Sequence, residues 1–366
     1  MRICFVLLSP TFGMHQYTSD LASRSLDAGY KVHLVTTSCG PLDRYSPRLS
    51  IHTPIAATNS GLERETLRFD RLYSVKAAIT ELDPDVVHFT GPHIWNFPLV
   101  KILSSAGVPV LHTLHDLEPH HGTRYGFLLR VWNSAIIRSA DHILVHGEKY
   151  RERLLQLGLP SDQVTYTPLT HLPLSFACQE ALAAKSSLSV RYEPFALFFG
   201  RLKAYKGLDY LLSAYGMMDA SADGLPGLVI AGPGRLARSV TLSIPRGVEL
   251  RNRLITDEET IDLFTRCGIL VMPYSDATQS ALVATAYYFR KPVLVTRSGA
   301  LPEYVEEGRT GRIVEPGQPA ALAQCMQQML SHPPQLTKMG LAGRTLYESY
   351  RMAETESLFS MYARVA

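Results

Sequence analysis

Short apolar runs alternate with helical hydrophobic patterns along the whole chain. The runs are 3–8, 31–36, 86–89, 108–111 and 143–145 in the first half, and 195–199, 228–231, 248–250, 269–272 and 292–296 in the second. Such short, continuously apolar runs are typical of strands covered on both faces, and their alternation with helices indicates parallel βαβ units. We therefore predict an α/β protein with two parallel sheets.

The periodicity fades between the two series of runs, over 166–187. This stretch contains Pro168, Pro173 and a run of small residues, which favour a linker. We place the boundary near 170–190 and predict one domain over 1–175 and a second over 188–346. The last stretch, 347–366, has apolar residues at helical spacing and is predicted to form a helix.

Composition narrows the functional classes. The 366 residues are 46% hydrophobic and 19% charged, which is enough for a large core. The net charge of +3 is too small and too scattered to indicate nucleic-acid binding, although small anions remain open as ligands. The five cysteines are far apart and lack metal-ligand spacing, which favours reduced thiols in a cytosolic protein. No run approaches the ~20 apolar residues needed to span a bilayer.

The turn after the run 195–199 carries three cations between two glycines, Gly200 and Gly207. In open α/β sheets, ligands bind at the carboxyl ends of strands, where helix N-termini offer free N–H groups to phosphates. Arg201 and Lys206 are therefore candidates for binding an anion, and a solvated basic loop is the alternative. Lys203 receives no role.

Two later turns at the same predicted sheet edge are also polar. In the first, after 269–272, Thr278, Gln279 and Ser280 are predicted to cap a helix. The second is 297–305, and three such turns at one edge favour a diphosphate ligand. The glycine-rich stretch 229–237 matches the dinucleotide fingerprint only weakly, because no acidic residue follows ~20 positions later, and we predict a tight strand exit there.

The first half offers two further candidates. Gly13 follows the first strand and permits close approach of the backbone to a ligand. Residues 111–121 contain four histidines and two acids, but their spacings match no compact zinc motif, so we predict no metal. His115 and Asp116 are instead candidates for binding hydroxyls or stabilising positive charge.

Taken together, these motifs resemble the family 4 glycosyltransferases over nearly the whole chain. The stretches that carry the resemblance are Gly200-Arg201-Leu202 with Lys206-Gly207, 276–293, 301–305, Gly308, Thr310-Gly311 and 314–317. The resemblance implies the GT-B fold, which has two facing Rossmann-like domains with parallel sheets and an interdomain cleft. It also implies that the terminal helix, about 347–366, crosses back onto the first domain.

The resemblance implies transfer of a hexose-type sugar from a nucleotide diphosphate donor, with retention of configuration and without a metal or other cofactor. The implied catalytic residues are His115, Asp116, Arg201 and Lys206. The implied donor-binding residues are Gly13, Arg201, Lys206, Arg253, Asp276, Gln279, Ser280, Ala281 and Thr285. Two departures stand out: the family's pair of glutamates falls at Ala277 and Thr285, and Met14 replaces a second glycine.

The expected acceptor is a glycan or a lipid-linked sugar in polysaccharide biosynthesis. The expected location is the cytoplasm, with peripheral contact at the inner face of the membrane as a further expectation. Residues 127–138 mix apolar residues and arginines in a way that suits a membrane surface, although we favour a core-facing helix. The alternatives are a nucleotide-sugar epimerase of the same fold and a non-catalytic nucleotide-sugar-binding relative, the latter motivated by the missing glutamates.

Overall fold

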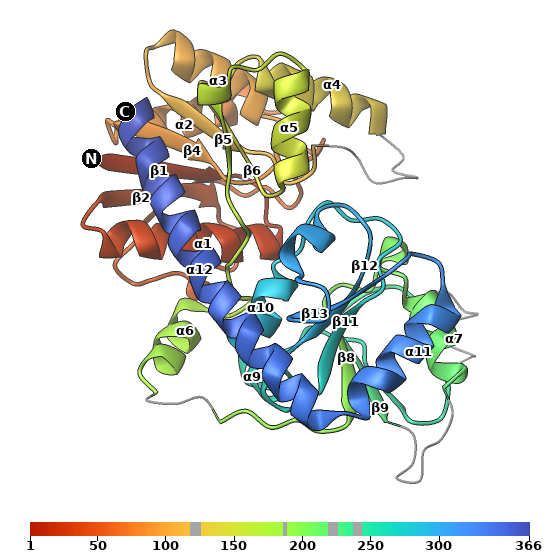
Figure 1. The fold of residues 1–366 in the computed structure, drawn as a ribbon. Coiled ribbons are helices and arrows are strands. Elements are labelled where there is room, and N and C mark those ends of the chain that lie inside the picture. Colours follow the sequence, from red (N-terminus) through yellow and green to blue (C-terminus); the bar gives the residue numbers. More distant parts are fainter. Residues whose placement is uncertain (118–125, 186–188, 219–225, 237–243) are drawn as a thin grey trace. The chain divides into compact units, whose positions relative to one another are not determined.

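The computed structural model describes residues 1–366 except 118–125, 186–188, 219–225 and 237–243. The chain forms two compact units (Figure 1). The first unit comprises Met1–Ala184 with Met352–Ala366, and the second comprises Lys185–Arg351. Each unit has its own parallel sheet, which confirms the predicted α/β class with two Rossmann-like domains.

The first unit contains a seven-stranded parallel sheet in the order β3-β2-β1-β4-β5-β6-β7. Its strands are β1 (Arg2–Leu7), β2 (Lys31–Thr37), β3 (Ser50–Ile55), β4 (Val86–Phe89), β5 (Val110–Thr113), β6 (His142–Val145) and β7 (Val164–Tyr166). Its helices are α1 (Phe12–Asp27), α2 (Phe69–Thr80), α3 (Asn96–Ser105), α4 (Gly126–Ile137), α5 (Glu148–Gln156) and α6 (Phe176–Ala183), with 3-10 turns η1 (Leu42–Arg44) and η2 (Ser161–Gln163). The strand order reverses between β1 and β4, and right-handed crossovers place α1 on one face and α3 and α4 on the other (Figure 1).

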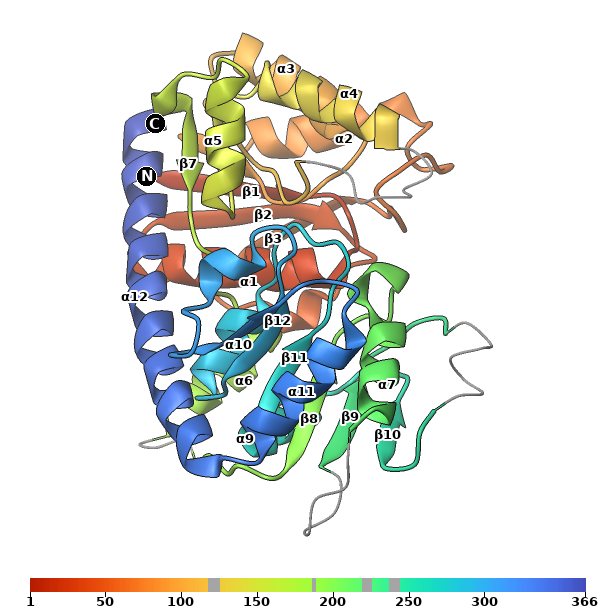
Figure 2. The ribbon, with the colours of Figure 1, turned by 45° about the vertical axis from the view of Figure 1, so that its right-hand side comes forward.

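The second unit contains a six-stranded parallel sheet in the order β10-β9-β8-β11-β12-β13. Its strands are β8 (Phe195–Phe199), β9 (Gly227–Ala231), β10 (Val248–Arg251), β11 (Ile269–Met272), β12 (Val293–Thr296) and β13 (Gly311–Val314). Its helices are α7 (Leu208–Gly216), α9 (Asp257–Arg266), α10 (Leu282–Tyr288) and α11 (Pro319–Leu330), with 3-10 turns η3 (Ala204–Lys206) and η4 (Leu301–Tyr304). The order reverses between β8 and β11, and α7 packs against α11 (Figure 2).

The last helix, α12 (Pro333–Val365), contributes to both units. Its residues up to Arg351 belong to the second unit, and those from Met352 onward belong to the first. Within the first unit, the carboxylate of Glu354 is buried against the guanidinium of Arg24, which also pairs with Asp20. Among the described helices, none combines the length and the apolar character needed to cross a membrane.

Candidate functional site

The loops at the carboxyl edge of the second sheet are packed backbone against backbone. Gly207 has a φ of +67°, and a Cβ placed there would lie 1.9 Å from the carbonyl oxygen of Pro273, just after β11. Gly299 has a φ of +55°, and its Cβ would lie 1.7 Å from the carbonyl oxygen of Ala277. Only glycine permits such contacts, so the loops after β8, β11 and β12 form one continuous edge.

Arg201 and Lys206, the two predicted anion-binding residues, lie in the loop after β8. Arg201 is exposed and Lys206 is half-buried. Desolvation lowers the pKa of Lys206 to about 8, with Tyr205 raising it and Arg201 lowering it. Within the part of the chain that the structure describes, neither cation forms an ion pair with a carboxylate. The loop after β8 therefore presents two cations that no described carboxylate neutralises by direct pairing, as an anion site requires.

The loop after β11 is bonded to the loop after β8. The backbone N–H groups of Ser275 and Asp276 donate to the carbonyl oxygen of Tyr205, at 2.8 and 3.4 Å. These bonds bring Asp276 and its neighbours to the edge that holds Arg201 and Lys206. Gln279 is half-buried, and its side-chain oxygen has no hydrogen-bond partner among the described residues.

The predicted helix cap in this loop is wrong. Helix α10 begins at Leu282, and Ala281, which has no side-chain oxygen, occupies the N-cap position. Ser280 Oγ accepts a bond from the backbone N of Leu282 at 3.4 Å, but Ser280 lies before the N-cap residue. Thr278 and the residue after it remain outside the helix, because the Thr278 carbonyl accepts a hydrogen bond from Ala300 N at 2.9 Å.

Thr285, another predicted donor-binding residue, lies inside α10. It is fully buried, and its hydroxyl donates to the carbonyl oxygen of Ala281 at 2.9 Å. It is therefore the least accessible of the predicted donor-binding residues. The position aligned with the family's second glutamate is thus occupied by a side chain that serves the helix itself.

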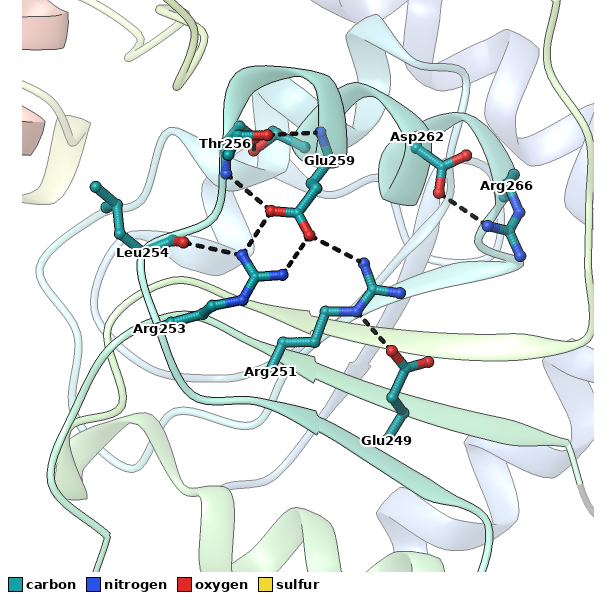
Figure 3. Close-up of polar contacts among 9 residues, drawn as sticks. Glu249, Arg251, Arg253, Leu254, Thr256, Glu259, Asp262 and Arg266 are labelled. Carbon is teal, nitrogen blue, oxygen red and sulfur yellow. Dashed lines mark hydrogen bonds and ion pairs between the residues drawn. The ribbon is translucent and has the colours of Figure 1, made fainter.

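Arg253 lies in the loop after β10 and is paired with Glu259 of α9 (Figure 3). Its guanidinium donates to both carboxylate oxygens, at 2.6 and 2.5 Å. The same carboxylate accepts a bond from the backbone N of Thr256 and completes a capping box at the start of α9. The bond from Arg253 and the backbone bond lower the pKa of Glu259 to about 2. Unlike Arg201 and Lys206, Arg253 already has an anionic partner.

The predicted residues of the first unit lie beyond β1 and β5. Gly13 is in the first turn of α1, and a Cβ placed there would meet nothing within 4 Å, so the space beside it is open. Asp116 is exposed, while its carbonyl oxygen accepts a hydrogen bond from Asn133 Nδ2 at 2.8 Å. His120 and His121 lie outside the described residues. Over the ranges that are described, no three His, Cys, Asp or Glu side chains are grouped to hold a metal ion.

His115 is buried at the end of β5. Its Nε2 donates to the carbonyl oxygen of Thr90 at 3.0 Å. Burial lowers the pKa of His115, so the ring is neutral and Nδ1 is left as a hydrogen-bond acceptor. Its ring packs edge-on against Tyr17, with 5.0 Å between centroids, and lies 5.1 Å from the ring of His146.

Tyr17 is a residue that sequence reasoning missed. Besides His115, its ring contacts those of His146 and His171, at 5.2 and 5.7 Å, and its hydroxyl lies 3.3 Å from Thr113 Oγ1. The sequence holds one signal for this cluster, because all but one of the 13 histidines precede residue 172. That signal shows a concentration of histidines but does not identify Tyr17 as the ring between them.

Two family models match this chain and together span most of it. A "Glycosyl transferase 4-like domain" matches residues 12–170, and "Glycosyl transferases group 1" matches residues 193–332. The first match includes Gly13, His115 and Asp116, and the second includes Arg201 and Lys206.

Several known proteins are similar over nearly their full length. The chain is 25% identical to D-inositol 3-phosphate glycosyltransferase of Streptomyces scabiei, over 92% of this chain and 83% of the relative. It is 28% identical to D-rhamnosyltransferase WbpZ of Pseudomonas aeruginosa, over 92% of this chain and 87% of the relative. The solved structure of HepE from Anabaena in complex with UDP-glucose has a TM-score of 0.75 at 15% identity, covering 99% of this chain and 100% of that one. The structural likeness shows a shared fold.

Proposed function

Because the chain belongs to the GT-B glycosyltransferases, we propose that it transfers a hexose-type sugar from a nucleoside diphosphate donor to a glycan or lipid-linked acceptor. One observation carries this proposal. Arg201 and Lys206 lie at the carboxyl edge of the second sheet with no carboxylate paired to either of them in the described structure. The donor's diphosphate supplies the missing negative charge.

The proposed reaction retains the configuration of the sugar. The bond between the anomeric carbon and the diphosphate oxygen breaks, and a bond forms on the same face to the acceptor's hydroxyl oxygen. The acceptor's proton passes to the departing diphosphate, whose developing charge Arg201 and Lys206 stabilise. His115 lines the sugar and, being neutral, accepts a hydrogen bond from a sugar hydroxyl at Nδ1. No metal or other cofactor takes part in this proposal.

The donor class is supported by a structural neighbour, since HepE is solved with UDP-glucose bound. We therefore propose UDP-glucose as the first donor to test, followed by guanosine and adenosine diphosphate sugars. A ligand that binds only the folded state raises the melting temperature, so a thermal-shift screen ranks the candidates.

We propose that the acceptor is lipid-linked and that α4 contacts the cytoplasmic face of a membrane. Asn133 and Ile136 of this helix are buried, but Phe127, Leu128 and Val131 are 76%, 61% and 52% exposed. The prediction that this helix faces the core therefore holds only for the second half of α4. Exposed apolar residues beside arginines suit an anionic lipid surface. Replacing the three exposed residues by Ser should reduce co-sedimentation with anionic vesicles, and unchanged co-sedimentation would contradict the contact.

The decisive experiment compares wild type with Arg201→Ala and Lys206→Met. Each variant should bind the donor at least tenfold more weakly and lose turnover, because one cation at a desolvated diphosphate contributes several kcal/mol. Donor binding and turnover near wild type in both variants would defeat the assignment.

Incubation with the donor alone tests the two alternative functions. An isomerised nucleotide sugar would indicate an epimerase. Donor binding without hydrolysis or transfer would indicate a non-catalytic relative, which the residues Ala277 and Thr285 make worth testing.

A further inference from the structure

Lys206 lies against the face of an aromatic ring. Its Nζ atom is 4.9 Å from the centroid of the Tyr274 ring. Tyr274 is 2% exposed and follows β11, the strand that neighbours β8 in the sheet. Gly200 leaves space for the ammonium group at the end of β8, because a Cβ at this position would crowd Nζ at a distance of 3.0 Å. The ammonium group is therefore held between the end of β8 and the ring.

The backbone fixes this arrangement on both sides of the ring. Before Tyr274, the carbonyl oxygen of Pro273 meets the open side of Gly207. After it, Ser275 donates to the carbonyl oxygen of Tyr205 through both its backbone N, at 2.8 Å, and its Oγ, at 3.1 Å. The segment 273–275 is thus registered against 205–207, which places the Tyr274 ring beside the lysine.

The groups around the ammonium include no carboxylate that pairs with it in the described chain. The charged and titratable groups that act on it are Arg201 in the same loop, Tyr205 in the same turn, and the Tyr274 ring from the loop after β11. An aromatic face attracts a cation through its quadrupole and adds no negative charge. A carboxylate in that place would neutralise the lysine and compete with an incoming phosphate.

We propose that Tyr274 is a positioning residue, whose ring face holds the Lys206 ammonium at the end of β8, ready for the donor's diphosphate. This inference rests on the proposed function, because it assumes that Lys206 binds the diphosphate. It requires the ring and not the hydroxyl, which is buried and interacts with the Ser280 side chain rather than with Lys206. The chain thereby offers a matched control, since Tyr274→Phe keeps the ring and Tyr274→Leu removes it.

Binding of inorganic pyrophosphate, followed by ³¹P NMR titration, tests the inference in the full chain. Tyr274→Leu should weaken binding about three- to thirtyfold, the range expected for a partly desolvated cation–π contact, and Tyr274→Phe should match wild type. In a Lys206→Met background, Tyr274→Leu should cause no further loss. Equal losses in the Leu and Phe variants, or none in either, would overturn the inference.

A second readout separates positioning from a merely structural role. The pKa of Lys206, about 8 in the wild type, can be followed by NMR of ¹³C-labelled lysine, with Lys206→Met assigning the signal. Removing the ring should lower this pKa, because the charged form loses its partner, whereas the Phe variant should leave it unchanged. An unchanged or raised pKa in Tyr274→Leu contradicts the inference. Pyrophosphate binding that survives Lys206→Met would instead refute the proposed role of Lys206, whatever Tyr274 does to the pKa.

Discussion

The hydroxyl of Tyr362 lies 2.7 Å from Nδ1 of His88, and both side chains are fully buried. This contact ties the end of α12 to β4, next to the switch point of the first sheet. The other nitrogen of the same ring lies 2.8 Å from Thr113 Oγ1 on β5, so the histidine is satisfied on both sides. The last helix is therefore attached to the first sheet by a buried polar chain as well as by apolar packing.

Replacing Tyr362 by Phe should destabilise the first unit by about 1–3 kcal/mol, because His88 Nδ1 is left buried without a partner. Urea unfolding followed by tryptophan fluorescence reports on this unit, since the two tryptophans of the chain, Trp95 and Trp132, both lie in it. Replacing Tyr30, which packs on Phe359 nearer the surface, by Phe keeps the ring contact and should cost less. Equal losses in both variants would contradict the polar role of the Tyr362 hydroxyl.

The first unit should also be sensitive to acid. Desolvation lowers the pKa of His88 and His112 to about 3, and that of His15, His93 and His142 to about 4, from 6.5 in the unfolded chain. Because the pKa of each histidine is lower in the folded state, the unfolded state takes up its protons at a higher pH than the folded state does. The stability from these groups is therefore complete above pH 6.5 and is lost as the pH falls, down to about 4 for His15, His93 and His142 and down to about 3 for His88 and His112. Each group contributes up to about 1.4 kcal/mol per unit of pH in that window.

The second unit provides the internal control for acid sensitivity. Its histidine, His332, is exposed. Tryptophan fluorescence reports the melting of the first unit, and a separate melting transition seen only by circular dichroism would report the second unit. Lowering the pH from 7 to 5 should therefore lower the melting temperature of the first transition more than that of the second. A fluorescence transition that is independent of pH in this range would contradict the buried neutral histidines.

Gly207 and Gly308 form a matched pair for testing the packed edge of the second sheet. Their φ angles are +67° and +74°, but a Cβ would lie 1.9 Å from the Pro273 carbonyl oxygen at Gly207 and would meet nothing within 4 Å at Gly308. Gly308→Ala should cost about 1–2 kcal/mol for the left-handed conformation alone. Gly207→Ala should cost clearly more in urea unfolding and should weaken pyrophosphate binding. Similar losses at the two positions would show that the edge is less tightly packed than described.

The capping box at the start of α9 predicts that substitutions of Thr256 and Arg253 destabilise this end of the helix by different amounts. Thr256→Ala should destabilise the start of α9 by about 1 kcal/mol, and Thr256→Ser should retain most of the cap. Arg253→Ala should have a smaller effect on stability that fades with added salt, because its pair with Glu259 is exposed (Figure 3). Hydrogen exchange of the first amides of α9 measures both effects. Donor binding that weakens in Arg253→Ala would support its predicted contact with the donor, and unchanged binding would remove it from the site.

The central strands and one edge strand, β10, were predicted from the sequence, whereas the other three edge strands were not. Strands such as β1 and β8 are buried on both faces, so their sequences are continuously apolar. The missed strands β3, β7 and β13 lie at the edges of the sheets and are partly exposed, so polar residues interrupt them. Their hydrogen bonds come from neighbouring strands, which no local pattern records.

The start of α10 was mispredicted for a related reason. Thr278, Gln279 and Ser280 have the chemistry of a cap, but tertiary contacts hold this loop outside the helix. The Thr278 carbonyl is bonded to Ala300, and the Ala277 carbonyl meets Gly299. These partners lie beyond the next strand, out of reach of a pattern read along the chain.

The sequence by itself determined the α/β architecture, the central strands, and the position of Arg201 and Lys206 at a strand end, because each depends on neighbouring residues along the chain. Only the tertiary structure decided what those cations contact. Lys206 follows β8 and Tyr274 follows β11, and the two meet because these strands are adjacent in the sheet although β9 and β10 separate them in the sequence. The same holds for the ring of Tyr17 on α1, which contacts His115, His146 and His171 because these histidines follow the adjacent strands β5, β6 and β7 and parallel pairing brings their strand ends to one edge.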